Sequence, residues 1–282
     1  MAVDVTAMEG AETEHTAPLP SKPVGLMDRR GMPAITGAIG LGIGLLMWQL
    51  YAMTQENMLF VPTVTATTAA LWGLLGDGEF WRAYGQTVLP FLYGWVLAIV
   101  VGVSTGLAVG RVGVIDRLSK PYVAFLNALP VSTLIPVVVI TLGIDMAARV
   151  MVVFLFAVVE VVLTTASSAK EIDPQLMQMA RSFQASRRQR FRRVVLPGAL
   201  PGILAGIRVG SARAVVGMVV LELLLVSVGV GLLLSRYKDT FQSPRLYALV
   251  VSLAIFGLAL QAVLRFMERR ILSWRPAAWG QE

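Results

Sequence analysis

The sequence contains no cysteine and only one histidine among its 282 residues. Without cysteine, the chain can form no disulfide, no thiolate zinc site and no cysteine nucleophile. The one histidine, His15, lies in a polar stretch near the N-terminus. These two shortages argue against a histidine-based catalytic triad and against a histidine-rich metal site.

Charged residues are also scarce, at 15% of the chain, whereas hydrophobic residues reach 56%. Soluble globular proteins contain about 25% charged and about 45–50% apolar residues. The mean hydropathy is +0.71, which is high for a soluble chain. This composition predicts an integral membrane protein.

Long uncharged stretches divide the chain into candidate membrane spans. A helix that crosses the hydrocarbon core needs about 20 apolar residues. Six stretches meet this requirement with few or no charges: Gly31–Gln55, Ala83–Gly110, Pro121–Ile144, Val150–Ala169, Leu196–Ser235 and Leu246–Leu264. We therefore predict an all-α integral membrane protein with six transmembrane helices.

The remaining segments suggest how the chain is organised. The first 30 residues are rich in acidic residues and proline, a composition typical of a disordered tail. Asn57–Gly76 is uncharged but carries Pro62 and four threonines, so we expect it to lie on the membrane surface. We predict a disordered cytoplasmic tail at 1–30, the first transmembrane helix and an extracytoplasmic connector at 31–80, a core at 81–275 with a long loop at 170–197, and a cytoplasmic tail at 276–282.

The positive residues predict the orientation of the chain. Most of the 24 lysine and arginine residues fall in the tails and loops on the side that carries both termini. Loops rich in lysine and arginine remain in the cytoplasm, so both termini are predicted to be cytoplasmic. The same distribution accounts for the net charge of +7 without a nucleic-acid partner.

Glycines recur at every fourth position in three of the predicted spans. They are Gly40 and Gly44, then Gly102, Gly106 and Gly110, and then Gly198, Gly202, Gly206 and Gly210. Residues four apart share a helix face, and small residues there let two membrane helices approach closely. Ordinary helix packing and a sliding interface both remain open as interpretations.

The loop at 170–197 has a pattern of its own. Asp173 and Pro174 are typical of a helix start, and Leu176, Met179, Ala180 and Phe183 then follow at helical spacing. Ser186 is positioned to cap a second, arginine-rich helix, which Leu196-Pro197 is expected to end at the membrane. The exposed apolar faces fit either docking to another protein or binding to anionic lipid.

The residues of this loop resemble the signature of the permeases of ABC importers. The family pattern is Glu-Ala-Ala, three residues, Gly, nine residues and Ile-x-Leu-Pro. The corresponding positions here are Gln178, Met179, Ala180, Gln184, Val194, Leu196 and Pro197. The spacing and the final Leu-Pro are intact, whereas Gln, Met and Gln replace the Glu, the first Ala and the Gly. The likeness extends over about Trp81 to Arg275 and is closest to the branch that imports nitrate, sulfonates, taurine, bicarbonate and some aromatic or pyrimidine compounds.

The resemblance implies the fold of a type I importer permease in a prokaryotic cytoplasmic membrane. It implies a second permease copy, a cytoplasmic ATPase dimer and an extracytoplasmic substrate-binding protein as partners. The segment 170–197 would be the coupling loop that contacts the ATPase, through Asp173, Gln178, Met179, Ala180, Phe183, Gln184, Ala185, Leu196 and Pro197. The sequence lacks a Gly-x-x-x-x-Gly-Lys-Ser/Thr loop, so we expect ATP and Mg²⁺ on the partner and no cofactor on this chain.

Four charged residues lie inside predicted spans: Glu160, Arg208, Arg213 and Glu222. A charge at the bilayer centre costs at least about 2.5–3.5 kcal/mol, so each should face a partner or water. The resembling family also carries arginine and glutamate at the positions of Arg208 and Glu222, which suggests a structural role for both. Glu160 and Arg213 are unusual there, as is Thr164. Their similar depth favours an ion pair, either buried between helices or lining a polar path.

Two other classes of function remain open at this point. A secondary transporter or channel would need no ATPase. An intramembrane enzyme could use Glu160 or Glu222 as an acid or base, although no second carboxylate lies near either residue in the sequence.

Overall fold

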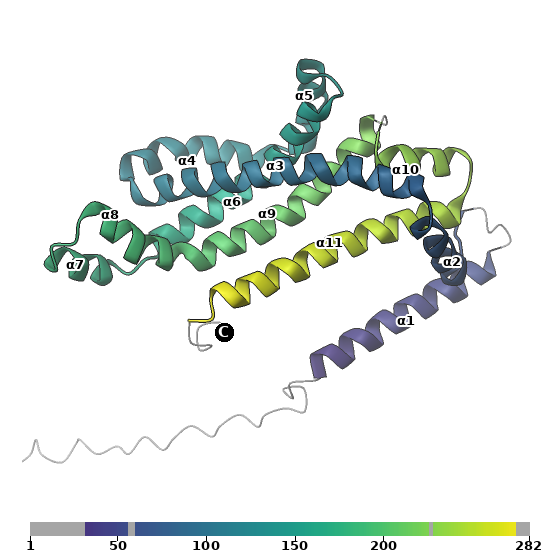
Figure 1. Cartoon of the computed structure of the whole chain (residues 1–282), viewed down its shortest axis with the longest axis horizontal. Coiled ribbons are helices and arrows are strands. Elements are labelled where there is room, and N and C mark those ends of the chain that lie inside the picture. The colour runs from purple at the N-terminus through teal and green to yellow at the C-terminus, as the bar shows by residue number, and fades with distance from the viewer. Residues whose placement is uncertain (1–31, 56–59, 226–227, 275–282) are drawn as a thin grey trace, which may run out of the picture. The chain divides into compact units, whose positions relative to one another are not determined.

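The computed structural model describes residues 32–55, 60–225 and 228–274 (Figure 1). The chain divides into two units, Met1–Leu50 and Tyr51–Glu282. Helix α1 (Met32–Thr54) supplies the described part of the first unit, and its last four residues fall in the second. The predicted tails, 1–30 and 276–282, lie outside the described residues.

The described part of the second unit contains only helices, which confirms the all-α fold. They are α2 (Val64–Leu75), α3 (Gly78–Arg111), α4 (Gly113–Ala128), a 3₁₀ turn (Val131–Leu134), α5 (Ile135–Leu142), α6 (Met146–Lys170), α7 (Pro174–Ser182), α8 (Arg187–Arg190), a π-helical turn (Phe191–Val195), α9 (Leu196–Leu225), α10 (Val230–Asp239) and α11 (Ser243–Ile271). Five helical segments of the described chain are long and apolar enough to cross a membrane: Ile35–Thr54, Gly78–Arg111, Met146–Lys170, Arg187–Leu224 and Ser243–Ile271.

The third predicted span, Pro121–Ile144, is not one continuous helix. Helix α4 ends at Ala128, Leu129 is extended (φ −72°, ψ 127°), and the eight-residue α5 ends at Leu142, with Gly143 as its C-cap. The break lies at Leu129 because the ring of Pro130 disfavours helical geometry at the residue before it. The fifth predicted span is also shorter than expected: α9 ends at Leu225, and a turn through Gly229 (φ 75°) leads into the separate helix α10.

Helix α6 lies between α3 and α9 and contacts both through their glycines. A Cβ atom added to Gly106 of α3 would lie 2.7 Å from the Cβ of Thr165. One added to Gly210 of α9 would lie 2.8 Å from Cγ2 of Val161. Two of the three predicted glycine ridges therefore bring helix backbones close together. Gly40 and Gly44 of α1 have no atom within 4 Å of an added Cβ among the described residues.

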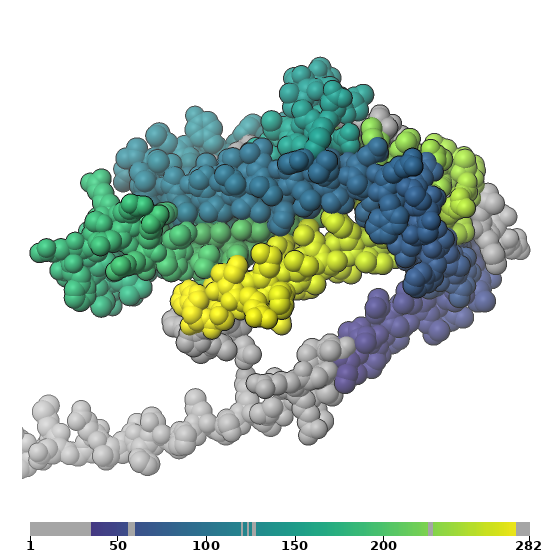
Figure 2. Space-filling model, in the orientation of Figure 1, coloured from purple at the N-terminus to yellow at the C-terminus, as the bar shows by residue number. Residues whose placement is uncertain are grey.

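Helices α2 and α10 form one end of the second unit, and α7 and α8 form the other (Figures 1 and 2). Leu74 of α2, Phe80 of α3, Leu233 and Tyr237 of α10 and Leu249 of α11 share a buried cluster at the first end. At 12 residues, α2 is too short to cross a membrane, as predicted for this segment.

The glycine contacts predict that Gly106→Ala destabilises the protein. Its new Cβ would lie 2.7 Å from the Cβ of Thr165 and 2.9 Å from the carbonyl oxygen of Val162. Overpacking of this kind costs about 1–3 kcal/mol. Gly85→Ala on the same helix is the matched control, because a Cβ there meets nothing within 4 Å. Thermal unfolding in detergent should show a lower Tm for Gly106→Ala and an equal or higher Tm for Gly85→Ala. Equal Tm values for the two variants would contradict the close packing.

Candidate functional site

The predicted start of α7 is confirmed. Asp173 caps the helix, and its Oδ1 accepts a hydrogen bond of 2.7 Å from the backbone N–H of Gln175. At the other end, Gln184 adopts a left-handed backbone (φ 53°). The N–H of Ala185 then donates to the carbonyl of Ala180 at 3.0 Å. The chain therefore turns sharply after α7 at the position where the resembling family carries glycine.

The predicted cap of α8 is also confirmed. The Oγ of Ser186 accepts from the N–H of Gln189 at 3.3 Å, and Oε1 of Gln189 accepts from the N–H of Ser186 at 2.8 Å. The predicted end of this helix at Leu196-Pro197 is wrong. The helix continues through the π-helical turn into α9, and the N–H of Leu196 bonds to the carbonyl of Phe191. Pro197 has no N–H, and its ring would clash with the carbonyl four residues earlier, so the wider turn before it accommodates the proline.

An apolar face of the loop is exposed. Leu176, Met179 and Phe183 are 50%, 55% and 82% exposed, and Ala180 lies half-buried beside them. Below the loop, Met177 packs against a cluster that includes Ile172 and Val195. The loop is therefore anchored on α9 and α6 and presents large apolar side chains away from the bundle. Of the other predicted loop residues, Gln178 and Gln184 are exposed, while Ala185, Leu196 and Pro197 are half-buried.

Two of the predicted intramembrane charges lie together. The Nε of Arg213 on α9 is 3.2 Å from Oε1 of Glu160 on α6. The side chain of Glu160 is 24% exposed and that of Arg213 is 63% exposed. The hydroxyl of Thr164, one turn from Glu160, donates to the Glu160 carbonyl at 2.8 Å. In the single chain the pair joins α6 and α9 and is partly exposed through Arg213.

Arg208 has a different partner, which the sequence analysis did not single out. Its guanidinium lies 3.5 Å from Oε2 of Glu268 on α11. Gln261 of α11 donates at 3.1 Å both to the Arg208 carbonyl and to Oγ of Ser211. Gln261 and Glu268 are seven residues apart, so they share a face of α11. These contacts fix α11 against α9 and agree with a structural role for Arg208.

Glu222 is buried and joins α9, α3 and α10. Its Oε1 accepts from the Thr87 hydroxyl at 2.6 Å, and its Oε2 accepts from the N–H of Gly231 at 2.9 Å. The Thr87 oxygen in turn accepts from the N–H of Val230 at 3.0 Å. Glu222 and Thr87 together satisfy the first two N–H groups of α10, which favours a structural role for Glu222 over acid–base chemistry. Gln86, also absent from the sequence analysis, adds a bond from the Gly229 N–H to its Oε1 at 3.2 Å.

The fold and these sites define a multi-pass membrane protein with an anchored loop at one end, whose apolar side chains point away from the helix bundle. The family model for the binding-protein-dependent transport system inner membrane component matches residues 98–273. The chain belongs to this family and is an ABC transporter permease component.

The similar proteins are consistent with membership of this family. A probable ABC transporter permease of Brucella abortus (strain 2308) is 27% identical over 85% of this chain and 98% of its own length. The aliphatic sulfonates permease SsuC of Escherichia coli K12, described as putative, is 28% identical over 84% of this chain and 91% of its own. The taurine permease TauC of the same organism is 25% identical over 85% and 90%. A solved inward-facing structure of the MetNI methionine transporter has the same fold, with TM-score 0.51 and 21% identity over 75% of this chain and 97% of that chain.

Substitution by glycine should have opposite effects on stability at Gln184, which has a left-handed backbone, and at Gln178, which lies within α7. Gln184→Gly should stabilise the loop by about 1 kcal/mol, because the left-handed conformation costs a side-chain-bearing residue about 1–2 kcal/mol. Gln178→Gly should destabilise α7 by about 1 kcal/mol, because Gln178 lies in the exposed helix interior. Hydrogen exchange at the N–H groups of Phe183 and Ala185 measures both effects. Protection that falls equally in both variants would contradict the prediction.

Proposed function

We propose that this chain is the transmembrane permease subunit of an ATP-driven importer that receives a small polar solute from an extracytoplasmic binding protein. It works by alternating access, as a homodimer whose two copies share one path. The observation that carries this proposal is the exposed ion pair of Glu160 and Arg213.

The position of the pair supports a polar path. Arg213 lies near the middle of α9 (Leu196–Leu225), and Glu160 lies about 15 Å from the end of α6 at Lys170. Charged side chains at such depth face a protein partner or water rather than lipid, because exposure to hydrocarbon is costly. Arg213 is 63% exposed in the single chain, so this face of α6 and α9 needs a polar cover. A second copy related by a two-fold axis would enclose a path lined by two such pairs.

The loop at 170–197 supports the ATP-driven mechanism. Its exposed apolar residues, Leu176, Met179 and Phe183, form a compact surface that fits a groove on a cytoplasmic ATPase. ATP and Mg²⁺ bind to that ATPase dimer, and this chain binds no cofactor. The arginines of α8 support a cytoplasmic position for the loop and for both termini, in a prokaryotic inner membrane.

The names of the similar proteins suggest which class of solute this chain transports. Two of them are named as permeases for taurine and for aliphatic sulfonates, and a third, from Chloroflexus aurantiacus and 26% identical over 89% of this chain, as a riboflavin permease. A path lined by paired opposite charges suits a polar solute and carries no net charge of its own. Sulfonates are therefore the first solutes to test, followed by nitrate, aromatic acids and pyrimidines.

The docking role of the loop predicts the effect of Ala180→Asp. A carboxylate in an apolar interface without a partner is strongly unfavourable, so copurification of the ATPase and substrate-stimulated ATP hydrolysis should fall about tenfold or more. Ser182→Asp is the control, because it adds the same charge at an exposed polar position of the same helix. Membrane insertion should be normal in both variants. Full transport by Ala180→Asp would rule out docking through this face.

The ion pair predicts non-additive mutations. Glu160→Gln and Arg213→Met should each lower uptake strongly, with a coupling energy of about 0.5–3 kcal/mol in the double-mutant cycle. The double variant should remain folded but transport poorly, because the pair lines the path. Uptake in proteoliposomes and Tm in detergent measure the two effects separately. The Arg208→Met and Glu268→Gln cycle is the control and should change Tm more than uptake per folded complex. Normal uptake by the double Glu160/Arg213 variant would show that the pair does not line the path.

A further inference from the structure

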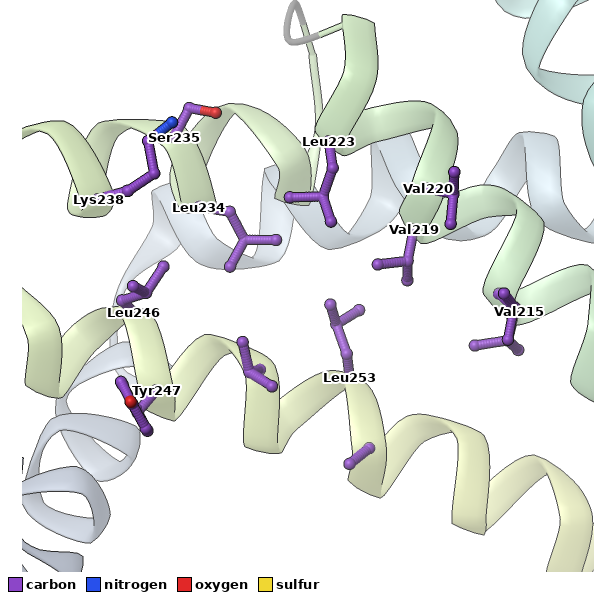
Figure 3. Close-up of a pocket in the computed structure, with 13 residues that line it drawn as sticks. Val215, Val219, Val220, Leu223, Leu234, Ser235, Lys238, Leu246, Tyr247 and Leu253 are labelled. Carbon is purple, nitrogen blue, oxygen red and sulfur yellow. The ribbon is translucent and has the colours of Figure 1, made fainter. Parts of the chain in front are cut away.

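A groove of about 690 Å³ lies between α9, α10 and α11 (Figure 3). Val215, Val219 and Leu223 of α9 face Leu246, Val250 and Leu253 of α11 across it. The groove is open to the surroundings, because Val216 and Val250 on its walls are 53% and 52% exposed. Neither the coupling loop nor the Glu160–Arg213 pair contributes to its lining.

The polar groups of the groove gather at one end. Lys238 and Ser235 extend from α10, and Tyr247 lies on the first turns of α11 (Figure 3). The side chain of Lys238 is 69% exposed, and its ammonium lies 3.5 Å from the carboxylate of its neighbour Asp239, whose side chain is similarly exposed. Lysine and tyrosine are typical of the membrane–water interface. The polar end therefore lies at headgroup depth, and the rest of the groove extends into the hydrocarbon layer.

The length of the groove matches one leaflet. Its α11 wall extends from Leu246 to Ala254, and its α9 wall from Val215 to Leu223. Each wall spans eight helical steps, or about 12 Å. Half of the hydrocarbon core is about 15 Å thick. An apolar channel of this length that starts at a cation fits one acyl chain beneath its own headgroup.

The walls favour a lipid over another helix. The contacts of α6 with α3 and α9 use glycine, as at Gly106 and Gly210, where an added Cβ would collide with α6. The groove is lined mainly by valine and leucine and contains no glycine. Branched side chains keep a neighbouring helix backbone at a distance, whereas a flexible acyl chain adapts to them.

We propose that this groove binds an anionic phospholipid, with the lipid phosphate at Lys238 and one acyl chain between α9 and α11. The site lies in the leaflet at the end of the bundle that carries α2 and α10. It is a binding site separate from the path for the solute. The bound lipid would fill the space between two helices that are also joined by the polar contacts of Arg208 with Gln261 and Glu268.

The test uses the full-length permease with its ATPase, reconstituted in nanodiscs of equal phosphatidylglycerol and phosphatidylcholine. Native mass spectrometry after detergent release measures which lipid is retained. Ala254→Trp fills the groove, and Ala259→Trp is the matched control, because both alanines are exposed on α11 and only Ala254 lines the groove. Lys238→Gln removes the cation at the polar end.

The wild type and Ala259→Trp should retain phosphatidylglycerol in preference to phosphatidylcholine. Ala254→Trp should lose the retained lipid. Lys238→Gln should reduce the preference about fivefold, the effect of one cation near the headgroups. Equal retention by Ala254→Trp and Ala259→Trp would overturn the proposal. Crosslinks from Val250 to another protein segment in the native membrane would also overturn it, because that segment would then occupy the groove.

Discussion

The close approach of α6 to both α3 and α9 is the contact on which the rest of the structure depends. Glycines on the two outer helices allow it, and Val161, Thr165 and Ala169 of α6 fill the space that they leave. Small polar side chains of α6 take part in these contacts as well, because Thr164 and Ser168 face Gly206 and Gly202 of α9. The charged Glu160 instead lies where it reaches Arg213 on the neighbouring helix. The close packing of α6 thus accommodates small polar groups, whereas its charged side chain lies at a partly exposed position.

Local features were predictable from the sequence, and the structure confirms them. The capping groups Asp173 and Ser186 act on N–H groups two or three residues away, so their role follows from sequence spacing. Hydropathy likewise predicts the long helices, because the hydrocarbon thickness sets their minimum length. The glycine ridges were predictable for the same reason, since residues four apart on a helix share a face.

Features that depend on distant partners were not predictable. Thr87 and Glu222 are 135 residues apart, and no periodicity relates them. The effect of Pro197 depends on the helix around it: the π-helical turn at Phe191–Val195 accommodates a proline that was expected to end a helix. The pairing of Glu160 with Arg213 follows from their similar depth, but the 63% exposure of Arg213 depends on which helices surround it.

The π-helical turn has a mechanical consequence. Because it keeps the chain helical, Arg187 to Leu224 form one uninterrupted segment of 38 residues. Arg190 and Arg213 on this segment are separated by about 35 Å along the axis. A rotation of the short arginine-rich helix α8 would therefore be transmitted to the middle of α9, because the helix between them is continuous.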